Sequence, residues 1–309
     1  MAARRRPKAS GKAHSFGGDW TQTKLGVLER YLAAYTMALK DQPSPDRRFV
    51  KGYIDAFAGT GYRARRVGVD DDTQQVSLPD HGHVEPQALL DGSARIALRT
   101  APEFDRYIFI EKSADRCKTL ESLKDEFPHL ASRVRIHQGD ANQQLQVLCA
   151  RDWRQHRAVL FLDPYGMNVE WRTIQAVAAT RAIDLWLLVP FGIGINRLLT
   201  RTGDIPPEWR ARLDTFLGTT DWFDAMYQVD NVQTTFDFDD TPRRVKARMD
   251  VVSQYFMDRL RTEFPAVATP GVLRNSTNCP LYLLCFAASN ERGAKIAVRI
   301  ADHILKEIR

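Results

Sequence analysis

The 309-residue sequence predicts an α/β fold with a mainly parallel sheet, a C-terminal antiparallel hairpin and a helical insertion. Short apolar runs that end in turn residues, such as Val159–Leu162, are typical of strands covered on both faces. Helical patterns alternate with these runs, and such alternation indicates parallel strands joined by helices. Residues 272–275 and 281–287 are two apolar runs separated by a short turn, which predicts the hairpin.

The first element is an amphipathic helix from Trp20 to Leu39, in which apolar residues recur at steps of three and four. A short strand ends at Asp55, and the helix after it begins at Pro86 or Ser93 and ends at Arg99. Further strands are expected at 107–111, 134–140, 159–162 and 183–191, and further helices at 114–127, 141–148 and 171–179. A last helix, from Arg292 to Ile308, is predicted to cover one face of the sheet.

The chain is divided by composition into four parts. Residues 1–18 are a basic flexible tail of small residues, arginines and lysines. Residues 19–195 form the α/β core, with a flap inserted at about 62–85 where a direct turn from strand to helix is usual. Residues 196–265 are interpreted as a mainly helical insertion or cap, because the strand–helix alternation stops there. Residues 266–309 complete the core with the final hairpin and helix.

The composition is that of a soluble globular protein, with 44% hydrophobic and 27% charged residues. No apolar run reaches the ~18 residues that a membrane span needs, and a cytoplasmic protein without membrane contact is expected. The four cysteines, Cys117, Cys149, Cys279 and Cys285, show no paired spacing and are expected to be reduced thiols used as small core residues.

The net charge of +6 permits binding to nucleic acid without indicating it. The basic tail and the flap, which contains Arg63, Arg65 and Arg66, are the two candidate contacts with phosphates. For the tail, the alternative is a solvated segment without a partner. The flap also contains His81, His83 and Glu85, but no further ligand pair stands nearby, and no metal site is predicted.

The most informative strand end is Asp163-Pro164-Tyr165-Gly166. Ligands of open α/β sheets bind beyond the carboxyl ends of the strands. Pro164 has no N–H and a fixed φ, so the chain leaves the sheet there with a carbonyl free to accept a hydrogen bond. A carboxylate, a carbonyl and an aromatic ring on one corner suit an exocyclic base amine, which needs acceptors for its hydrogens and a surface for stacking.

A second strand end, Asp55-Ala56-Phe57-Ala58-Gly59-Thr60-Gly61, runs into a Gly-x-Gly turn, which permits close approach of a ligand to the backbone. Ala64 stands where a dinucleotide fingerprint has its third glycine, and the next acid after a strand is Glu111. The turn therefore fits an adenosyl cofactor without a pyrophosphate better than NAD.

Two further strand ends carry acids. Glu111 is suited to accept both hydroxyls of a ribose, and Asp140 with Ala141 is suited to the edge of an adenine. Since a helix follows each strand, the alternative for either acid is a helix N-cap.

These motifs, in this order, resemble those of Rossmann-like S-adenosylmethionine-dependent methyltransferases, and more closely those of the three-Cys-motif partner protein family (TcmP). The resemblance runs from about residue 19 to the end of the chain. It rests on residues 19–25 with Leu28 and Tyr31, 55–61, 92–94, 161–166 with Trp171, 190–192, 208–209 with 221–222, 274–276 and 280–282.

The resemblance implies a methyltransferase-like fold, S-adenosylmethionine as cofactor and a partner protein that carries three cysteines. It also implies that Lys24, on a first helix over the methionine end of the cofactor, pairs with the cofactor carboxylate; the alternative is a helix lysine in water. One position departs from the motif of amino-methyltransferases, Asp/Asn-Pro-Pro-Tyr/Phe: Tyr165 follows Pro164 directly.

The leading functional prediction is an S-adenosylmethionine-dependent methyltransferase that acts on an exocyclic amine of a nucleic-acid base. Its cofactor would be bound by Lys24, Asp55, Phe57, Gly59, Gly61, Glu111, Asp140 and Ala141, and its acceptor by Asp163, Pro164 and Tyr165. The alternative is a non-catalytic partner subunit of a three-Cys-motif protein. An NAD-linked oxidoreductase is disfavoured by the missing third glycine and by the absence of a Tyr-x-x-x-Lys pair.

Overall fold

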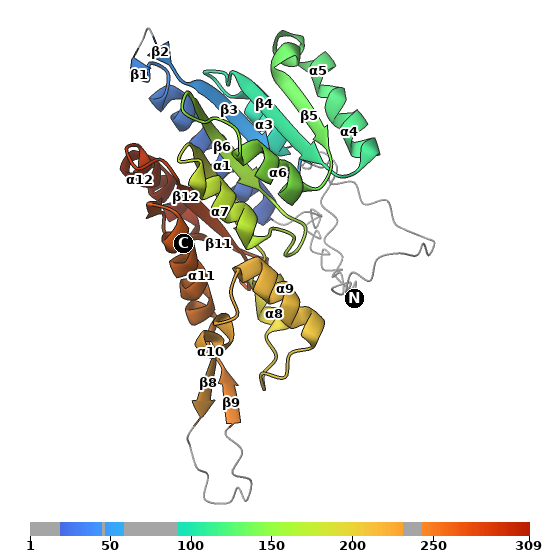
Figure 1. The fold of residues 1–309 in the computed structure, drawn as a ribbon, viewed down its shortest axis with the longest axis vertical. Helices are drawn as coiled ribbons and strands as arrows, with labels where there is room; N and C mark the ends of the chain where they lie inside the picture. Colours follow the sequence, from blue (N-terminus) through green and yellow to red (C-terminus); the bar gives the residue numbers. More distant parts are fainter. Residues whose placement is uncertain (1–18, 45–46, 59–91, 231–242) are drawn as a thin grey trace, which may run out of the picture.

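The computed structural model describes residues 19–44, 47–58, 92–230 and 243–309. In these residues a central sheet lies between two layers of helices (Figure 1). From one edge inward the strands are β5 (Val134–Gln138), β4 (Arg106–Glu111), β3 (Val50–Asp55), β6 (His156–Leu162), β7 (Ile183–Val189) and β12 (Pro280–Ala288). The short strands β10 (Ala266–Val267) and β11 (Gly271–Arg274) pair along the outer side of β12.

The direction of the strands confirms the predicted fold class. Strands β5, β4, β3, β6 and β7 are parallel to one another. Strand β12 runs antiparallel to β7 and to both short strands. This is a Rossmann-like methyltransferase fold, mainly parallel, with the expected C-terminal hairpin. Every residue of β7 is buried, as expected for a strand with helices on both faces.

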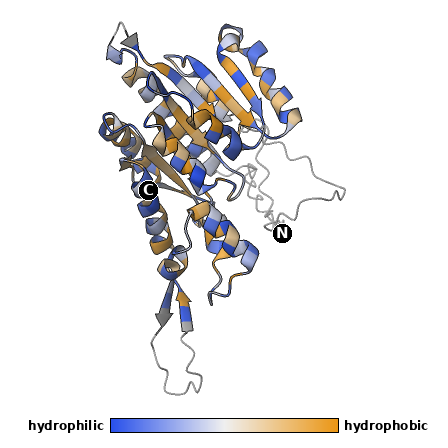
Figure 2. Ribbon diagram, in the orientation of Figure 1, coloured by the Kyte–Doolittle hydropathy of each residue, from blue (hydrophilic) through white to orange (hydrophobic). Residues whose placement is uncertain are grey.

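The two faces of the sheet bury separate hydrophobic clusters because side chains alternate along each strand. One face is covered by α1 (Asp19–Ala38), α3 (Gly92–Arg99), α4 (Ala114–Glu121), α5 (Leu123–Glu126) and α12 (Ala294–Leu305). The other is covered by α6 (Ala141–Cys149), α7 (Trp171–Ala179) and α11 (Met249–Glu263). Figure 2 shows the hydrophobic residues concentrated in the strands between these layers.

Most predicted elements lie where they were expected, including α1, whose residues Val27, Leu28 and Tyr31 are buried at helical spacing. The predicted helix 114–127 is divided at Ser122 into α4 and α5. The expectation of core thiols is confirmed for Cys285, which lies 3.7 Å from the sulfur of Met257. It is wrong for Cys279, which is exposed in the loop between β11 and β12.

Between β7 and α11 the chain forms a projection (Figure 1). It contains α8 (Asn196–Leu198), α9 (Pro207–Leu217), α10 (Trp222–Met226) and the antiparallel strands β8 (Tyr227–Asp230) and β9 (Arg243–Lys246). Its aromatic residues Trp222, Phe223 and Tyr227 are buried, which confirms that they serve the core. Helix α11 packs on α7 and contributes to the hydrophobic cluster of the main sheet.

Four basic residues, Arg243, Arg244, Lys246 and Arg248, precede the helix that reaches Phe264. The structure places the first three in β9, and the helix begins at Met249. The pairing partner of β9 is β8, so the strand is stabilised by hydrogen bonds that a local pattern does not reveal.

No helix in the described ranges is long and apolar enough to cross a membrane.

A buried acid fixes α1 to the sheet. Asp184, near the start of β7, accepts a hydrogen bond of 2.8 Å from the hydroxyl of Tyr31 on α1. Burial raises the pKa of the Asp184 carboxyl to about 7, although the bond from Tyr31 and the charge of Arg157 lower it. The folded protein therefore retains a proton on Asp184 at pH values where the unfolded chain has released it.

We expect Asp184→Asn to gain stability relative to the wild type as the pH rises from about 4 to 7. Over this range the folded wild type binds more protons than the unfolded chain, so its free energy of unfolding falls, whereas asparagine carries no such proton. Urea unfolding followed by circular dichroism at several pH values measures the difference. Asp115→Asn, at an exposed position of α4, is the control. A constant difference between Asp184→Asn and the wild type would contradict the assignment.

Candidate functional site

The candidate site lies at the carboxyl ends of β3, β4 and β6. From β3, the chain order runs through β4 to β5 on one side and through β6 to β7 on the other. Such a reversal in strand order opens a crevice in which ligands of α/β proteins bind. Asp55 is the last residue of β3, Glu111 is the last residue of β4, and Asp163 directly follows β6. The structure thus brings together three of the predicted site residues at adjacent strand ends.

The loop after β3 is bonded to both neighbouring strands. The amide of Ala56 donates to the carbonyl of Phe161 on β6 at 3.3 Å, and the amide of Ala58 donates to the carbonyl of Ile110 on β4 at 3.2 Å. The predicted residues Gly59 and Gly61, the tail and the whole flap lie outside the described residues. The entry of the chain into the glycine turn is nevertheless fixed between β4 and β6.

Asp55 is fully buried beneath this loop. Its carboxylate accepts hydrogen bonds from the amide of Phe57 and the hydroxyl of Tyr53, both at 3.3 Å, and from Ser93 at the start of α3. Burial raises the pKa of the Asp55 carboxyl to about 7; the bond from Ser93 lowers it, and the negative charge of Asp163 raises it. Asp55 is consequently a carboxyl group that can change its protonation state near neutral pH.

Lys24 extends from α1 to the same edge. Its ammonium nitrogen lies 2.5 Å from Oδ2 of Asp163 and 5.2 Å from the centre of the Trp20 ring. The side chain of Lys24 is 4% exposed and that of Asp163 is 29% exposed, so the alternative of a lysine in water is wrong. The ammonium engages Oδ2 of Asp163, and a carboxylate has a second oxygen, Oδ1, with its own capacity to accept.

The residues after Asp163 form a corner with one covered and one exposed side. Pro164 is buried, whereas Tyr165 is 69% exposed. The carbonyl of Tyr165 accepts a hydrogen bond of 2.5 Å from the side chain of Asn168. The carbonyl of Asn168 in turn accepts from Asn142 at 2.8 Å. The exposed ring therefore stands on a backbone that is held by hydrogen bonds.

Asn142 was not assigned a role from the sequence. Its side chain is buried and bonded at both ends of its amide: Nδ2 donates to Asn168, and Oδ1 accepts from the amide of Glu170 at 3.0 Å and from the hydroxyl of Thr173 at 2.9 Å. It thus joins the start of α6 to the loop after Asp163. The only signal in the sequence was its place directly after Asp140 and Ala141.

The two remaining acids differ in their surroundings. Asp140 caps α6: its Oδ1 accepts a hydrogen bond from the amide of Gln143 at 3.1 Å. In this structure it therefore has the helix N-cap geometry that the sequence left open as an alternative. Ala141, the first residue of α6, is buried. Glu111 is nearly buried and accepts from the amide of Ser113 at 2.8 Å, with the guanidinium of Arg116 at 3.7 Å. It does not cap α4 and lies at the same sheet edge as Asp55.

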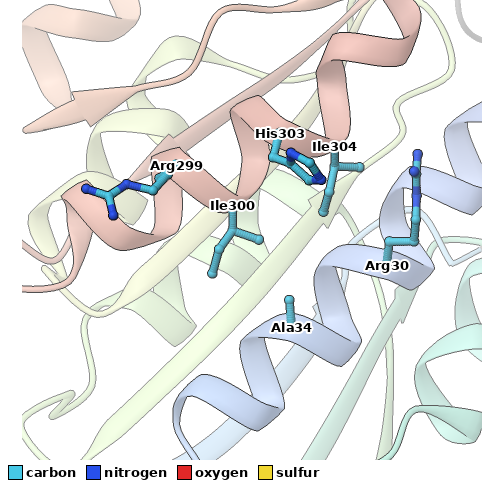
Figure 3. A pocket seen from close by; sticks show the side chains of 6 residues that line it. All are labelled: Arg30, Ala34, Arg299, Ile300, His303 and Ile304. Atoms are coloured by element: carbon cyan, nitrogen blue, oxygen red, sulfur yellow. The ribbon is translucent and has the colours of Figure 1, made fainter.

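A hollow of about 500 Å³ lies elsewhere, between α1 and α12 (Figure 3). It is lined by Arg30, Ala34, Arg299, Ile300, His303 and Ile304. No carboxylate contributes to this lining, and Arg30 is paired with Glu307 at 2.7 Å. Within the described ranges, no group of histidine, cysteine and acidic side chains is arranged to bind a metal ion. The strand-end residues therefore remain the candidate site.

No protein-family model and no curated protein sequence matches the chain. Among solved structures, protein LPL1258 of Legionella pneumophila is similar over 94% of this chain and 93% of its own, with 11% identity and a TM-score of 0.47. Spermidine synthase of Thermotoga maritima is similar over 88% of this chain and 60% of its own, with 8% identity and a TM-score of 0.39. YhhF of Escherichia coli, described as a candidate methyltransferase, is similar over 92% of this chain and 90% of its own, with 11% identity and a TM-score of 0.34. These similarities concern the fold.

We expect Asn142→Ala to lower the free energy of unfolding by about 2 kcal/mol or more, because it leaves several buried polar groups without their partner. Gln143→Ala, in the same helix turn, is the control and should change it by about 0.5 kcal/mol at most. Urea unfolding measures the stability, and hydrogen exchange of residues 164–170 shows whether the loop opens locally. Equal effects of the two substitutions would show that Asn142 does not hold the loop.

Proposed function

We propose that the chain is an S-adenosylmethionine-dependent methyltransferase that acts on an exocyclic amine of a nucleic-acid base. The observation that carries this proposal is the convergence of two motifs on one sheet edge. The loop that begins at Asp55 and the Asp163-Pro164-Tyr165 corner follow adjacent strands and are joined by the Ala56–Phe161 hydrogen bond. A cofactor and an acceptor bound at these two loops would meet over the same edge.

The side chains at this edge fit the cofactor in their chemistry. The cofactor carries two ribose hydroxyls, an ammonium group and an adenine amine, all of which are donors and need acceptors. Asp55, Glu111 and Asp140 supply carboxylates, while Phe57, Gly59, Gly61 and Ala141 are the proposed close backbone and apolar contacts. When bound, the cofactor supplies an electrophilic methyl group. Lys24 is the proposed partner of its carboxylate, although its ammonium pairs with Asp163 in this structure.

The Lys24–Asp163 pair supports a neutral acceptor. An isolated carboxylate favours a cationic alkylamine, but Lys24 already compensates the charge of Asp163 at 2.5 Å. A neutral exocyclic amine instead needs oriented acceptors, and Asp163 Oδ1 with the Pro164 carbonyl are proposed for this task. The exposed ring of Tyr165 would stack on the base, which must leave a duplex to reach it. Preorganised acceptors of this kind lower the barrier by positioning and by electrostatic stabilisation.

The membership of the chain in the three-Cys-motif partner family is part of this proposal and rests on its sequence motifs. The alternative function, a non-catalytic partner subunit, draws support from two observations. Tyr165 stands one position earlier than the usual aromatic residue, and Lys24 occupies one oxygen of Asp163. Cofactor binding without transfer to any acceptor would favour this alternative.

We expect Asp163→Ala to abolish methyl transfer while S-adenosylmethionine still binds with nearly the affinity of the wild type. Titration calorimetry measures the binding, and transfer of a radiolabelled methyl group to oligonucleotides measures the activity. Gly59→Asp/Glu111→Ala, which should lose binding, is the control for the cofactor site. Equal loss of binding and transfer in Asp163→Ala would show that Asp163 serves the fold or the cofactor.

Asp163→Ala also leaves the buried ammonium of Lys24 without a partner, which is destabilising by about 3–5 kcal/mol for a fully buried pair and by less here, where Asp163 is partly exposed. Asp163→Asn keeps an acceptor for Lys24 and should therefore retain more of the stability. Lys24→Met/Asp163→Ala removes both charges. If this double variant is as stable as the wild type, any instability of Asp163→Ala comes from the unpaired ammonium of Lys24.

A further inference from the structure

The projection between β7 and α11 carries four arginines without a carboxylate partner in the described part of the chain: Arg201, Arg210, Arg212 and Arg244. Three of them are exposed, and Arg212 is half-buried. Several carboxylates of the same segment are engaged by protein groups. Asp204 accepts from Thr202, Asp214 accepts from the Trp222 ring nitrogen, and Asp221 accepts from Thr219 and Tyr255. The four arginines are hereafter called the arginine surface, and none of them is paired with these carboxylates.

The arginine surface begins at the candidate acceptor corner. The guanidinium of Arg212 on α9 lies 3.4 Å from the position that a Cβ of Gly166 would occupy, and Gly166 directly follows Tyr165. Helix α9 also packs against α7, which follows the same corner (Figure 1). A ligand that contacts Arg212 would therefore lie beside the exposed ring of Tyr165.

Away from the corner, the guanidinium groups are fixed on an aromatic residue. The guanidinium carbons of Arg210 and Arg244 lie 4.6 and 5.0 Å from the centre of the Phe223 ring. Gly203 turns the chain next to this packing with a φ of +84°, and its Cβ position is at ordinary contact distance, 3.5 Å, from Arg244, Phe223 and Tyr227. Stacking on a ring holds the planar guanidinium while its N–H donors face outward.

Arg201 adds charge next to a half-buried lysine. The ammonium of Lys246 donates to the carbonyls of Asn196 and Leu199 at 2.6 and 2.7 Å. Burial, and then the charge of Arg201, lowers the pKa of Lys246. An anion beside Arg201 and Lys246 would relieve the repulsion between these two charges.

We infer that the arginine surface binds the phosphate backbone of a single-stranded nucleic acid and directs one of its bases to Tyr165. Arginine is the side chain best suited to phosphate, because its fork of donors matches the phosphate oxygens. Cationic side chains together with an exposed aromatic ring are the groups by which proteins hold single strands without reading their sequence. An unpaired base presents its face to the ring, whereas a paired base does not. The inference rests on the proposed function and specifies its substrate.

The test is fluorescence anisotropy with a labelled 16-nucleotide single strand, as RNA and as DNA, over a range of salt concentrations. In Arg210→Gln/Arg244→Gln, we expect the affinity to fall tenfold or more. The slope of log affinity against log salt should fall by about 0.7 for each phosphate that the variant no longer neutralises. The control is Arg292→Gln/Arg299→Gln, which removes the same charge from two exposed positions, one just before α12 and one within it. It should change the affinity less than twofold. Equal effects of the two double variants would overturn the inference.

Two further variants separate stacking from charge. Tyr165→Ala should weaken binding while the salt slope is unchanged, since a ring makes no ionic contact. Arg210→Lys/Arg244→Lys should retain most of the salt slope, and its thermal unfolding shows whether the packing on Phe223 is needed for the fold. Tighter binding of the duplex form of the same sequence than of the single strand would overturn the inference in favour of a duplex partner.

The inference and the proposed function fail in different ways. A wild type that binds S-adenosylmethionine and transfers methyl groups to nucleic acid, with no change in the arginine variants, leaves the function intact and removes the role of this surface. A wild type that binds single strands through these arginines, but transfers no methyl group, supports the surface and removes the catalytic proposal. Absence of single-strand binding by the wild type at low salt overturns the inference.

Discussion

The ion pair between Lys24 and Asp163 is the interaction on which the candidate site depends. Asp55 and Asp163 stand at the ends of adjacent strands; Asp55 is fully buried, and Asp163 is compensated by the ammonium of Lys24 at 2.5 Å. Lys24 reaches Asp163 because α1 is fixed to the sheet by its buried residues and by the Tyr31–Asp184 hydrogen bond. Since a buried charge without a partner is costly, α1, β3 and β6 must keep their relative positions for the pair to persist.

The loops after β3 and β6, which carry the proposed cofactor and acceptor contacts, are both held by hydrogen bonds. The loop after β3 is attached to β6 and β4 through Ala56 and Ala58. Asn142 attaches the start of α6, next to the proposed adenine contact Asp140, to the loop that carries Tyr165. Both loops are therefore held at the same edge of the sheet. For the proposed transfer reaction this is useful, because the relative position of donor and acceptor has to be held to within about 0.5 Å.

The projection extends the acceptor side of this network toward solvent. In the projection, Trp222 and Phe223 are buried core residues. The ring of Phe223 also contacts the guanidinium groups of Arg210 and Arg244. An aromatic core beneath the guanidinium groups explains how this segment holds these charges in place. Arg212, on the same helix α9 as Arg210, lies beside Gly166 at the proposed acceptor corner.

The sequence alone determined the order of strands and helices, the hairpin and the strand ends that carry Asp55, Glu111 and Asp163, because these follow from local periodicity and turn chemistry. Tertiary structure decided which of these groups meet. That Lys24 is buried against Asp163, that Asn142 holds the acceptor loop and that Arg243–Lys246 is a strand depend on partners far away in the chain. Burial and pairing are properties of the folded surroundings of a residue, and the residues next to it in the sequence do not specify them.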